Sequence, residues 1–213
     1  MQNLFLMQEK ESKLMQLFHE IQSGDRTAFD ELFNMYYQRL LIFAKQYIKQ
    51  HESAEEIACE LFVKLWLKRD TLSSVLNPEV YLYVSVKNAC LNFIRSNKKR
   101  AALFLDNESL PTNEKVLGNY STIEDKELVK LLDAAVDCLP EQRRLIFKLI
   151  KEDGLKTAAV AQILGLSKRT VENQLYKAVK ALAEAISDYL GYHPQSKIAK
   201  KQALSELSIL FFL

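Results

Sequence analysis

The chain has 213 residues, 48% of them hydrophobic and 26% charged, so it is long enough for one large or two small domains and is unlike a disordered chain. Its five glycines and four prolines leave little room for the many tight turns of a β-sandwich or barrel, which makes all-α the default fold class. The formal net charge of +2 is too small to attract a polyanion, so any affinity for nucleic acid must come from local clusters of basic side chains.

The cysteines and histidines indicate neither a disulfide framework nor a metal site. Cys59, Cys90 and Cys138 are isolated thiols without CxxC spacing, and the three histidines add no paired ligand spacing. The apolar run at the N-terminus is too short for a signal peptide, and no segment approaches the roughly 20 apolar residues that cross a bilayer. We therefore expect a reduced, cytoplasmic protein without metal or cofactor.

Four amphipathic helices with a shared core are predicted in the first hundred residues. They are expected at about 12–23, at 27–48, at 53–69, and from Pro78 to about Arg100. In the third, apolar residues recur at alternating spacings of three and one, which is typical of one helix face. These residues are Ala54, Ile57, Ala58, Leu61, Phe62, Leu65 and Trp66.

Two of these helices carry start signals. Ser53 and Glu56 have the spacing of a capping box, in which each side chain satisfies a free amide of the first turn. Asn77 is expected to cap the fourth helix, and Pro78 suits its first position, where the missing N–H is not needed.

A linker at 101–122 is predicted to separate this block from a second helical one. The helical spacing of apolar residues stops there, and Asn, Ser, Thr, Pro and Gly become frequent. The stretch from 105 to 127 carries six acidic and two basic residues. Helices are then expected at 123–139, from Pro140 to a stop at Gly154, at 157–164, and after Ser167 as a cap.

The last two helices have the pattern of a helix-turn-helix. Gly165 suits their tight connection, Ala161 allows close approach, and a shared core is expected from Val160, Leu164, Leu166, Val171 and Leu175. With Val171, Leu175, Ala178, Val179 and Leu182 facing inward, the opposite side would present Lys168, Arg169, Glu172, Asn173, Tyr176 and Lys177. Such side chains suit base edges and phosphates in a DNA major groove. The plainer alternative is an ordinary helical hairpin.

The two blocks, in this order, resemble an extracytoplasmic-function sigma factor of the sigma-70 family. "SGDRTAFDELFNMYYQRL", "AEEIACELFVKLW" and "VYLYVSVKNACLNFIR" match the family's region two, and "LPEQRRLIFKLIKEDGLKTAAVAQILGLSKRTVENQLYKAVKAL" matches region four. The resemblance covers about residues 14 to 187. It implies a region-two domain at 1–100, a linker at 101–122, a region-four helix-turn-helix domain at 123–190 and an apolar extension at 191–213.

The resemblance also implies a task for each block. The helix with "AEEIACELFVKLW" would dock on core RNA polymerase through Glu56, Glu60 and Lys64, with Cys59 where relatives usually carry glutamine. The helix from Tyr81 would engage the minus-ten promoter element through Lys87, Asn88, Arg95, Lys98, Lys99 and Arg100. The last helix would read the minus-thirty-five element through Lys168, Arg169, Thr170, Glu172, Asn173 and Lys177. Expected partners are therefore core RNA polymerase, promoter DNA and an anti-sigma factor, with no small-molecule substrate.

Several alternatives remain open at this point. Tyr81 and Tyr83 are candidates either to stack on bases or to fill the core, and the basic run "RSNKKR" is either a DNA contact or a solvated helix end. The acidic linker is either a mimic of RNA in the polymerase or a solvated tether.

An enzyme is not expected, because no phosphate-binding loop or nucleophile motif is present. An autonomous helix-turn-helix regulator, for example one of the response-regulator type, is the alternative function. The receiver domain of such a regulator would show alternating strands and helices, whereas the first block of this chain is predicted to be helical.

The last residues, 191–213, end in five consecutive apolar side chains. Ile198, Leu204, Leu207, Leu210 and Phe211 are compatible with an amphipathic helix. Because such a surface is unfavourable in water, we expect it to dock: on the second domain's own core, across both domains as an inhibitory lock, or on a membrane or partner.

Overall fold

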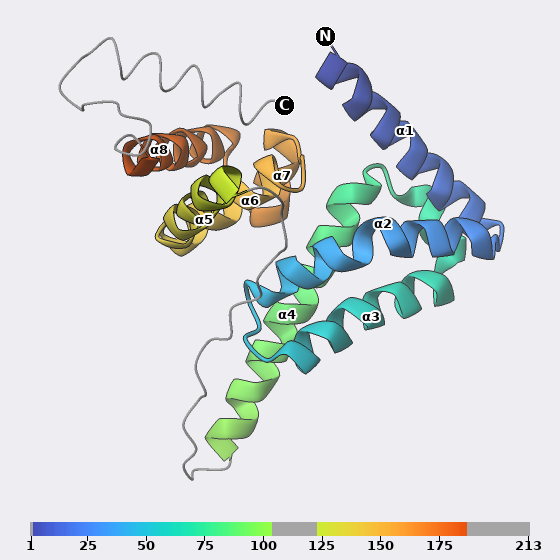
Figure 1. Ribbon diagram of the computed structural model, residues 1–213. Coiled ribbons are helices and arrows are strands. Elements are labelled where there is room, and N and C mark those ends of the chain that lie inside the picture. Colours follow the sequence, from blue (N-terminus) through green and yellow to red (C-terminus); the bar gives the residue numbers. More distant parts are fainter. Residues whose placement is uncertain (1, 104–122, 187–213) are drawn as a thin grey trace. The chain divides into compact units, whose positions relative to one another are not determined.

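The computed structural model describes residues 2–103 and 123–186, which form helices and turns without a strand (Figure 1). The chain divides into two compact units, with the division between residues 113 and 114. The all-α prediction is therefore confirmed. Most of the predicted linker (104–122) and the C-terminal extension (191–213) lie outside the described residues.

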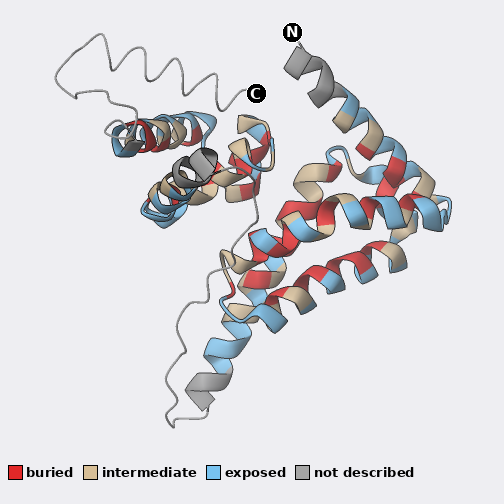
Figure 2. Cartoon of the chain, in the orientation of Figure 1, coloured by how far each residue is buried: buried red, intermediate tan, exposed pale blue. Residues whose placement is uncertain are grey.

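Within residues 2–103, the described part of the first unit, there are four α-helices and one short 3-10 helix. They are α1 (Gln2–Gln22), α2 (Arg26–Lys45), α3 (His51–Leu67), η1 (Arg69–Ser74) and α4 (Pro78–Leu103). α2 packs against α1, α3 and α4, and α3 also packs against α4. The buried residues of Figure 2 run along the facing sides of these helices, where large side chains such as Leu32, Tyr36, Phe62 and Tyr83 are fully buried.

A polar cluster joins three helices of this unit at the edge of its core. The Tyr36 hydroxyl of α2 donates to a Glu79 carboxylate oxygen of α4 at 2.9 Å. The Lys10 ammonium group of α1 lies 2.8 Å from the same oxygen. Because Glu79 is largely withdrawn from water, these two partners compensate its carboxylate for lost hydration.

The observed helix ends agree with the predicted ones at some positions and differ from them at others. The Asn77 side chain accepts a hydrogen bond from the Val80 amide at 3.2 Å, so the predicted cap of α4 is confirmed. The predicted capping box is wrong, because α3 begins two residues earlier, at His51, and Ser53 therefore lies inside its first turn. The Ser53 hydroxyl lies 3.3 Å from the Gln50 side chain instead. α4 also continues three residues past the expected end, to Leu103.

The second unit contains α5 (Ile123–Asp137), α6 (Glu141–Lys151), α7 (Thr157–Leu164) and α8 (Lys168–Ile186). α8 packs against each of the other three helices. Val136, Leu139, Phe147, Ala178 and Leu182 form a buried cluster at the α5–α6–α8 junction. This packing holds the opposite side of α8 out to solvent. Among the described helices, none is long and apolar enough to cross a membrane.

Candidate nucleic-acid interface

The connection between α7 and α8 has the geometry that the helix-turn-helix pattern predicts. Gly165 ends α7 in the left-handed region, with φ +71° and ψ +36°, a conformation that is strained for residues with a side chain. The Leu166 amide donates to the Ala161 carbonyl at 2.9 Å, and Ala161 itself is buried. Two residues later, the Ser167 hydroxyl accepts from the Thr170 amide at 3.0 Å and so caps α8.

α8 faces the core with the predicted side. Val171, Ala178 and Leu182 are buried, and Leu175 and Val179 pack partly buried against the same cluster. The opposite side of its first three turns exposes Lys168, Arg169, Glu172, Asn173, Tyr176 and Lys177. We call these six residues the α8 face.

The α8 face combines positive charge with donors and acceptors that suit DNA. Lys168 lies 3.6 Å from Glu172, but both side chains are more than half exposed, so solvent screens this pair strongly. The Thr170 hydroxyl, only half-exposed, lies 2.8 Å from that of Ser167 and thus helps to fix the cap. Free amides at this helix end also favour a phosphate oxygen. Tyr176, 65% exposed, adds an aromatic ring that can pack on a sugar or a thymine methyl.

A second basic surface follows the C-terminal half of α4. Asn88, Asn92, Arg95 and Lys99 recur at spacings of four, three and four on one exposed side of this helix, and Lys98 is exposed beside them. Lys87, the residue before Asn88, is half-buried, and Arg100 belongs to α4 although its side chain lies outside the described residues. From Arg95 to Lys99 no acidic residue interrupts the run. The surface can therefore follow a nucleic-acid backbone.

The two tyrosines at the start of α4 take part in the core. Tyr83 is fully buried, and its ring meets that of Phe43 edge-on at 5.1 Å between centroids. Tyr81 is half-buried and meets Phe18 edge-on at 6.2 Å. Of the two alternatives, stacking on a base or filling the core, Tyr83 therefore fills the core, because it has no exposed surface on which a base could stack.

The predicted polymerase-binding residues lie together on the exposed side of α3. Glu56, Glu60 and Lys64 are all exposed, and the Lys64 ammonium group lies 2.8 Å from a Glu60 carboxylate oxygen. Cys59 is exposed next to them and beside Tyr37 of α2. Burial raises the pKa of the Tyr37 hydroxyl, and the neighbouring Cys59 and Glu55 raise it further.

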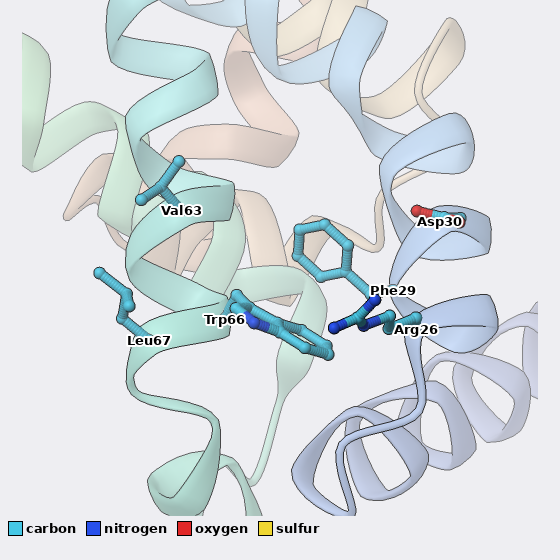
Figure 3. Close-up of a pocket in the computed structure, with 6 residues that line it drawn as sticks. All are labelled: Arg26, Phe29, Asp30, Val63, Trp66 and Leu67. Carbon is cyan, nitrogen blue, oxygen red and sulfur yellow. The ribbon is translucent and has the colours of Figure 1, made fainter.

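An apolar hollow of about 400 Å³ lies next to these residues, between α2 and α3. Phe29 and Trp66 face one another between the two helices, and Arg26 extends toward the Trp66 ring (Figure 3). The two rings meet at 5.2 Å between centroids. Val63 and Leu67 line the hollow while remaining 55% and 69% exposed, and Asp30 lies at its edge.

Sequence reasoning did not identify this hollow. It placed Trp66 on the buried side of α3, whereas the ring is only half-buried and forms one wall of the hollow. Val63 and Leu67 could have indicated the hollow from sequence, because they are large apolar residues four apart that fall outside the predicted core face. Exposed apolar side chains that gather in this way make the hollow a candidate docking surface.

Two sigma-70 family models match the chain, in the order of its two units. The sigma-70 region 2 model matches residues 32–100, and the sigma-70 region 4 model matches residues 130–182. Together they cover more than half of the chain. The first match contains α3 and the basic surface of α4 up to Arg100, and the second contains α7 and the whole α8 face.

Known proteins match most of this chain over most of their own length. The ECF RNA polymerase sigma factor SigW of Bacillus subtilis is 22% identical over 178 residues, which is 79% of this chain and 94% of SigW. The ferric citrate uptake sigma factor FecI of Escherichia coli is 25% identical over 152 residues, 71% of this chain and 87% of FecI. The sigma factor RpoE of Bartonella quintana, solved in complex with the anti-sigma factor NepR, has a similar fold, with a TM-score of 0.56 and 19% identity over 75% of this chain and 96% of RpoE.

Proposed function

Because the chain belongs to the extracytoplasmic-function sigma factors of the sigma-70 family, which direct core RNA polymerase to specific promoters, we propose that three surfaces of its two units divide this task. The α8 face reads duplex DNA at the minus-thirty-five element. The exposed side of α4 engages the minus-ten element. The exposed side of α3, with the adjoining hollow, binds core polymerase.

The α8 face is the single observation that supports the DNA assignment most strongly. Arg169 and Asn173 lie one turn apart on an exposed helix face, and the guanidinium and amide groups suit bidentate contacts to guanine and adenine. Lys168 and Lys177 add cations at the ends of this face, where they suit phosphates. Gly165 and the Ser167 cap fix the angle at which α8 leaves α7, and so the direction in which the face points.

The minus-ten assignment rests on the charge and exposure of α4. Its exposed lysine and arginine side chains attract phosphates, while Asn88 and Asn92 can hydrogen-bond to bases that leave the duplex. The buried Tyr83 supplies rigidity here and no stacking surface, so the proposal assigns the contact to the polar side of the helix.

The polymerase assignment rests on the mixed character of the α3 surface. An exposed ion pair lies beside an apolar hollow whose walls include Phe29 and Trp66. A protein interface commonly combines an aromatic centre with a charged rim in this way. Because the partner polymerase is cytoplasmic, we place the protein there, and we include an anti-sigma factor among its partners. The protein itself would turn over no substrate.

DNA binding with and without polymerase tests the proposal. The purified chain and its complex with core polymerase are each titrated onto labelled fragments that carry a promoter for the complex. A sigma factor should bind these fragments specifically only in the complex. Equal and specific binding by the chain alone, as a dimer on paired half-sites, would instead support an autonomous helix-turn-helix regulator.

Charge reversal on α3 tests the polymerase surface separately. Glu56→Lys with Glu60→Lys should weaken binding to core polymerase without unfolding the first unit, because both side chains are exposed. Asp133→Lys with Asp137→Lys is the matched control, because it reverses two exposed acids with the same spacing on α5. Pull-down with core enzyme measures both. Equal binding by the two double variants would place the polymerase contact elsewhere.

A further inference from the structure

Arg143 of α6 forms a hydrogen bond to α8, against which α6 packs (Figure 1). Its Nε group donates to the Gln174 side-chain oxygen at 3.3 Å, and both side chains are half-buried. Among the described residues, Arg143 has no carboxylate partner, and its Nη1 and Nη2 groups meet no further acceptor. The hydrogen bond therefore holds the guanidinium group in place and leaves its positive charge without a counter-charge.

The position of Gln174 on α8 places Arg143 at one edge of the α8 face. Gln174 follows Thr170 by four residues and precedes Lys177 by three, so these residues share one side of the helix. Lys177 is exposed and belongs to the α8 face, whereas Gln174 is half-buried. Gln174 thus marks the border between the α8 face and the side that packs on α6, and the Arg143 guanidinium group meets it there.

The neutral partner of Arg143 distinguishes it from two lysines of α8. Lys168 lies 3.6 Å from a Glu172 carboxylate oxygen, and Lys180 lies 4.0 Å from one of Glu184. A carboxylate partner competes with an incoming phosphate for the same cation, whereas an amide oxygen leaves the charge available. A guanidinium group also presents two parallel N–H groups that match the oxygens of a phosphate.

We propose that Arg143 binds a phosphate of the DNA backbone at the edge of the α8 face, and that Gln174 holds its guanidinium group in the orientation for this contact. The inference rests on the proposed function of the α8 face and extends the DNA contact to α6. A phosphate contact positions the second unit on the duplex without reading a base. The plainer alternative is a brace between α6 and α8 that only stabilises the fold.

Removal of the Arg143 charge tests the contact. Complexes of core polymerase with the full chain, or with its Arg143→Gln variant, are titrated onto promoter fragments at several salt concentrations. The variant should bind about tenfold more weakly, which is the lower end of what a hydrogen bond to a charged group contributes. The slope of log affinity against log salt should fall by about 0.9, because one phosphate fewer is neutralised.

Arg144→Gln is the matched control. Arg144 is the next residue of α6 and is also half-buried, but its Nη1 group donates to the Asp137 carbonyl of α5 at 2.7 Å. The substitution removes the same charge from the same helix, and it should leave both affinity and salt slope close to those of the unmodified chain. Equal changes of slope in the two variants would overturn the proposal, because the effect would then belong to the net charge of the unit.

Neutral phosphates identify the contact directly. Methylphosphonates replace the phosphates of the upstream element one at a time, which removes a charge and leaves the bases unchanged. At one position the replacement should weaken binding of the unmodified chain and of the Arg144→Gln variant, but have no effect on the Arg143→Gln variant. If every position keeps its full effect in the Arg143→Gln variant, the proposal is overturned.

Gln174→Ala tests the positioning role, because it keeps Arg143 and its charge. The substitution should weaken promoter binding in the otherwise unmodified chain and cause no further loss when Arg143→Gln is already present. Additive losses would show that Gln174 acts independently of Arg143 and would overturn the positioning role.

Thermal unfolding separates the phosphate contact from the brace. If Arg143 only braces the fold, Arg143→Gln should lower the midpoint of unfolding and leave the salt slope unchanged. That result, with specific promoter binding by the unmodified complex, would overturn the inference and leave the proposed function in place. Absence of specific promoter binding by the unmodified complex would contradict the proposed function together with the inference that rests on it.

Discussion

Arg169 and Asn173 carry the specificity expected of the α8 face. Arg169→Ala or Asn173→Ala should each cost about 1 to 3 kcal/mol in binding of the preferred promoter and change the upstream sequence preference, because a lost base contact removes discrimination at that base. The measurement is selection from a promoter library randomised in the minus-thirty-five region, using reconstituted holoenzyme.

Lys177→Ala is the matched control on the same face. A phosphate contact carries no sequence information, so this variant should weaken binding to all promoters alike and reduce the salt dependence. An unchanged sequence preference in both the Arg169 and the Asn173 variant would contradict the proposed docking of α8.

Cys90 reports on the core of the first unit. Its side chain is fully buried, and burial raises the pKa of the thiol to about 11, whereas Cys59 and Cys138 are exposed. Since the thiolate is the reactive form, a thiol reagent at pH 8 should label two cysteines of the native protein rapidly. Cys90 should react only after denaturant is added. Rapid labelling of all three in the native protein would contradict the packing of α4.

α3 contains two nearby leucines, one of which should affect the stability of the protein and the other its binding to polymerase. Leu65 is 1% exposed in the core, and Leu67, two residues later, is 69% exposed at the hollow. Leu65→Ala should lower the free energy of unfolding by about 2 to 5 kcal/mol, because it leaves a cavity. Leu67→Ala should change it by less than about 0.5 kcal/mol, yet weaken binding to core polymerase.

Denaturant titration and polymerase pull-down measure these two effects. Circular dichroism at increasing denaturant gives the free energy of unfolding for each variant. Similar losses of stability from Leu65→Ala and Leu67→Ala would show that the hollow belongs to the core and would remove the basis for a docking surface.

Local rules made several features of these elements predictable. Asn77, Ser167 and Gly165 act as expected, because a cap or a left-handed glycine depends on a few neighbouring residues. The capping box predicted at Ser53 is wrong, because such a motif depends on the exact start of the helix and α3 begins two residues earlier. Asp25 was overlooked, although its carboxylate accepts from the Thr27 and Ala28 amides at the start of α2.

Features that depend on tertiary packing were less accessible to sequence reasoning. The burial of Tyr83 depends on Phe43 of α2 as well as on α4, so the spacing within α4 left its role open. The hollow requires Phe29 from one helix and Trp66 from another, which no single periodic pattern contains. The inward and outward sides of α8, in contrast, follow from one helix's own period.

At the scale of the whole molecule, the described residues include two exposed basic surfaces, one on α4 and one on α8. A net charge of +2 gives little general attraction to DNA, so affinity has to come from the exposed surfaces of α4 and α8. Each surface lies in a different compact unit. A promoter with two separated elements suits this organisation, because each unit alone would bind weakly and polymerase would supply their joint alignment.

Transcription by reconstituted holoenzyme tests this account most directly. Core RNA polymerase is incubated with the chain and a genomic template library, and the 5′ ends of the transcripts are mapped. Core polymerase alone and core polymerase with the Arg169→Ala variant serve as controls. We expect discrete start sites that require the chain and share two sequence elements upstream, with the distal element altered among the starts that the variant uses. Start sites that are the same with and without the chain would contradict its assignment as a sigma factor.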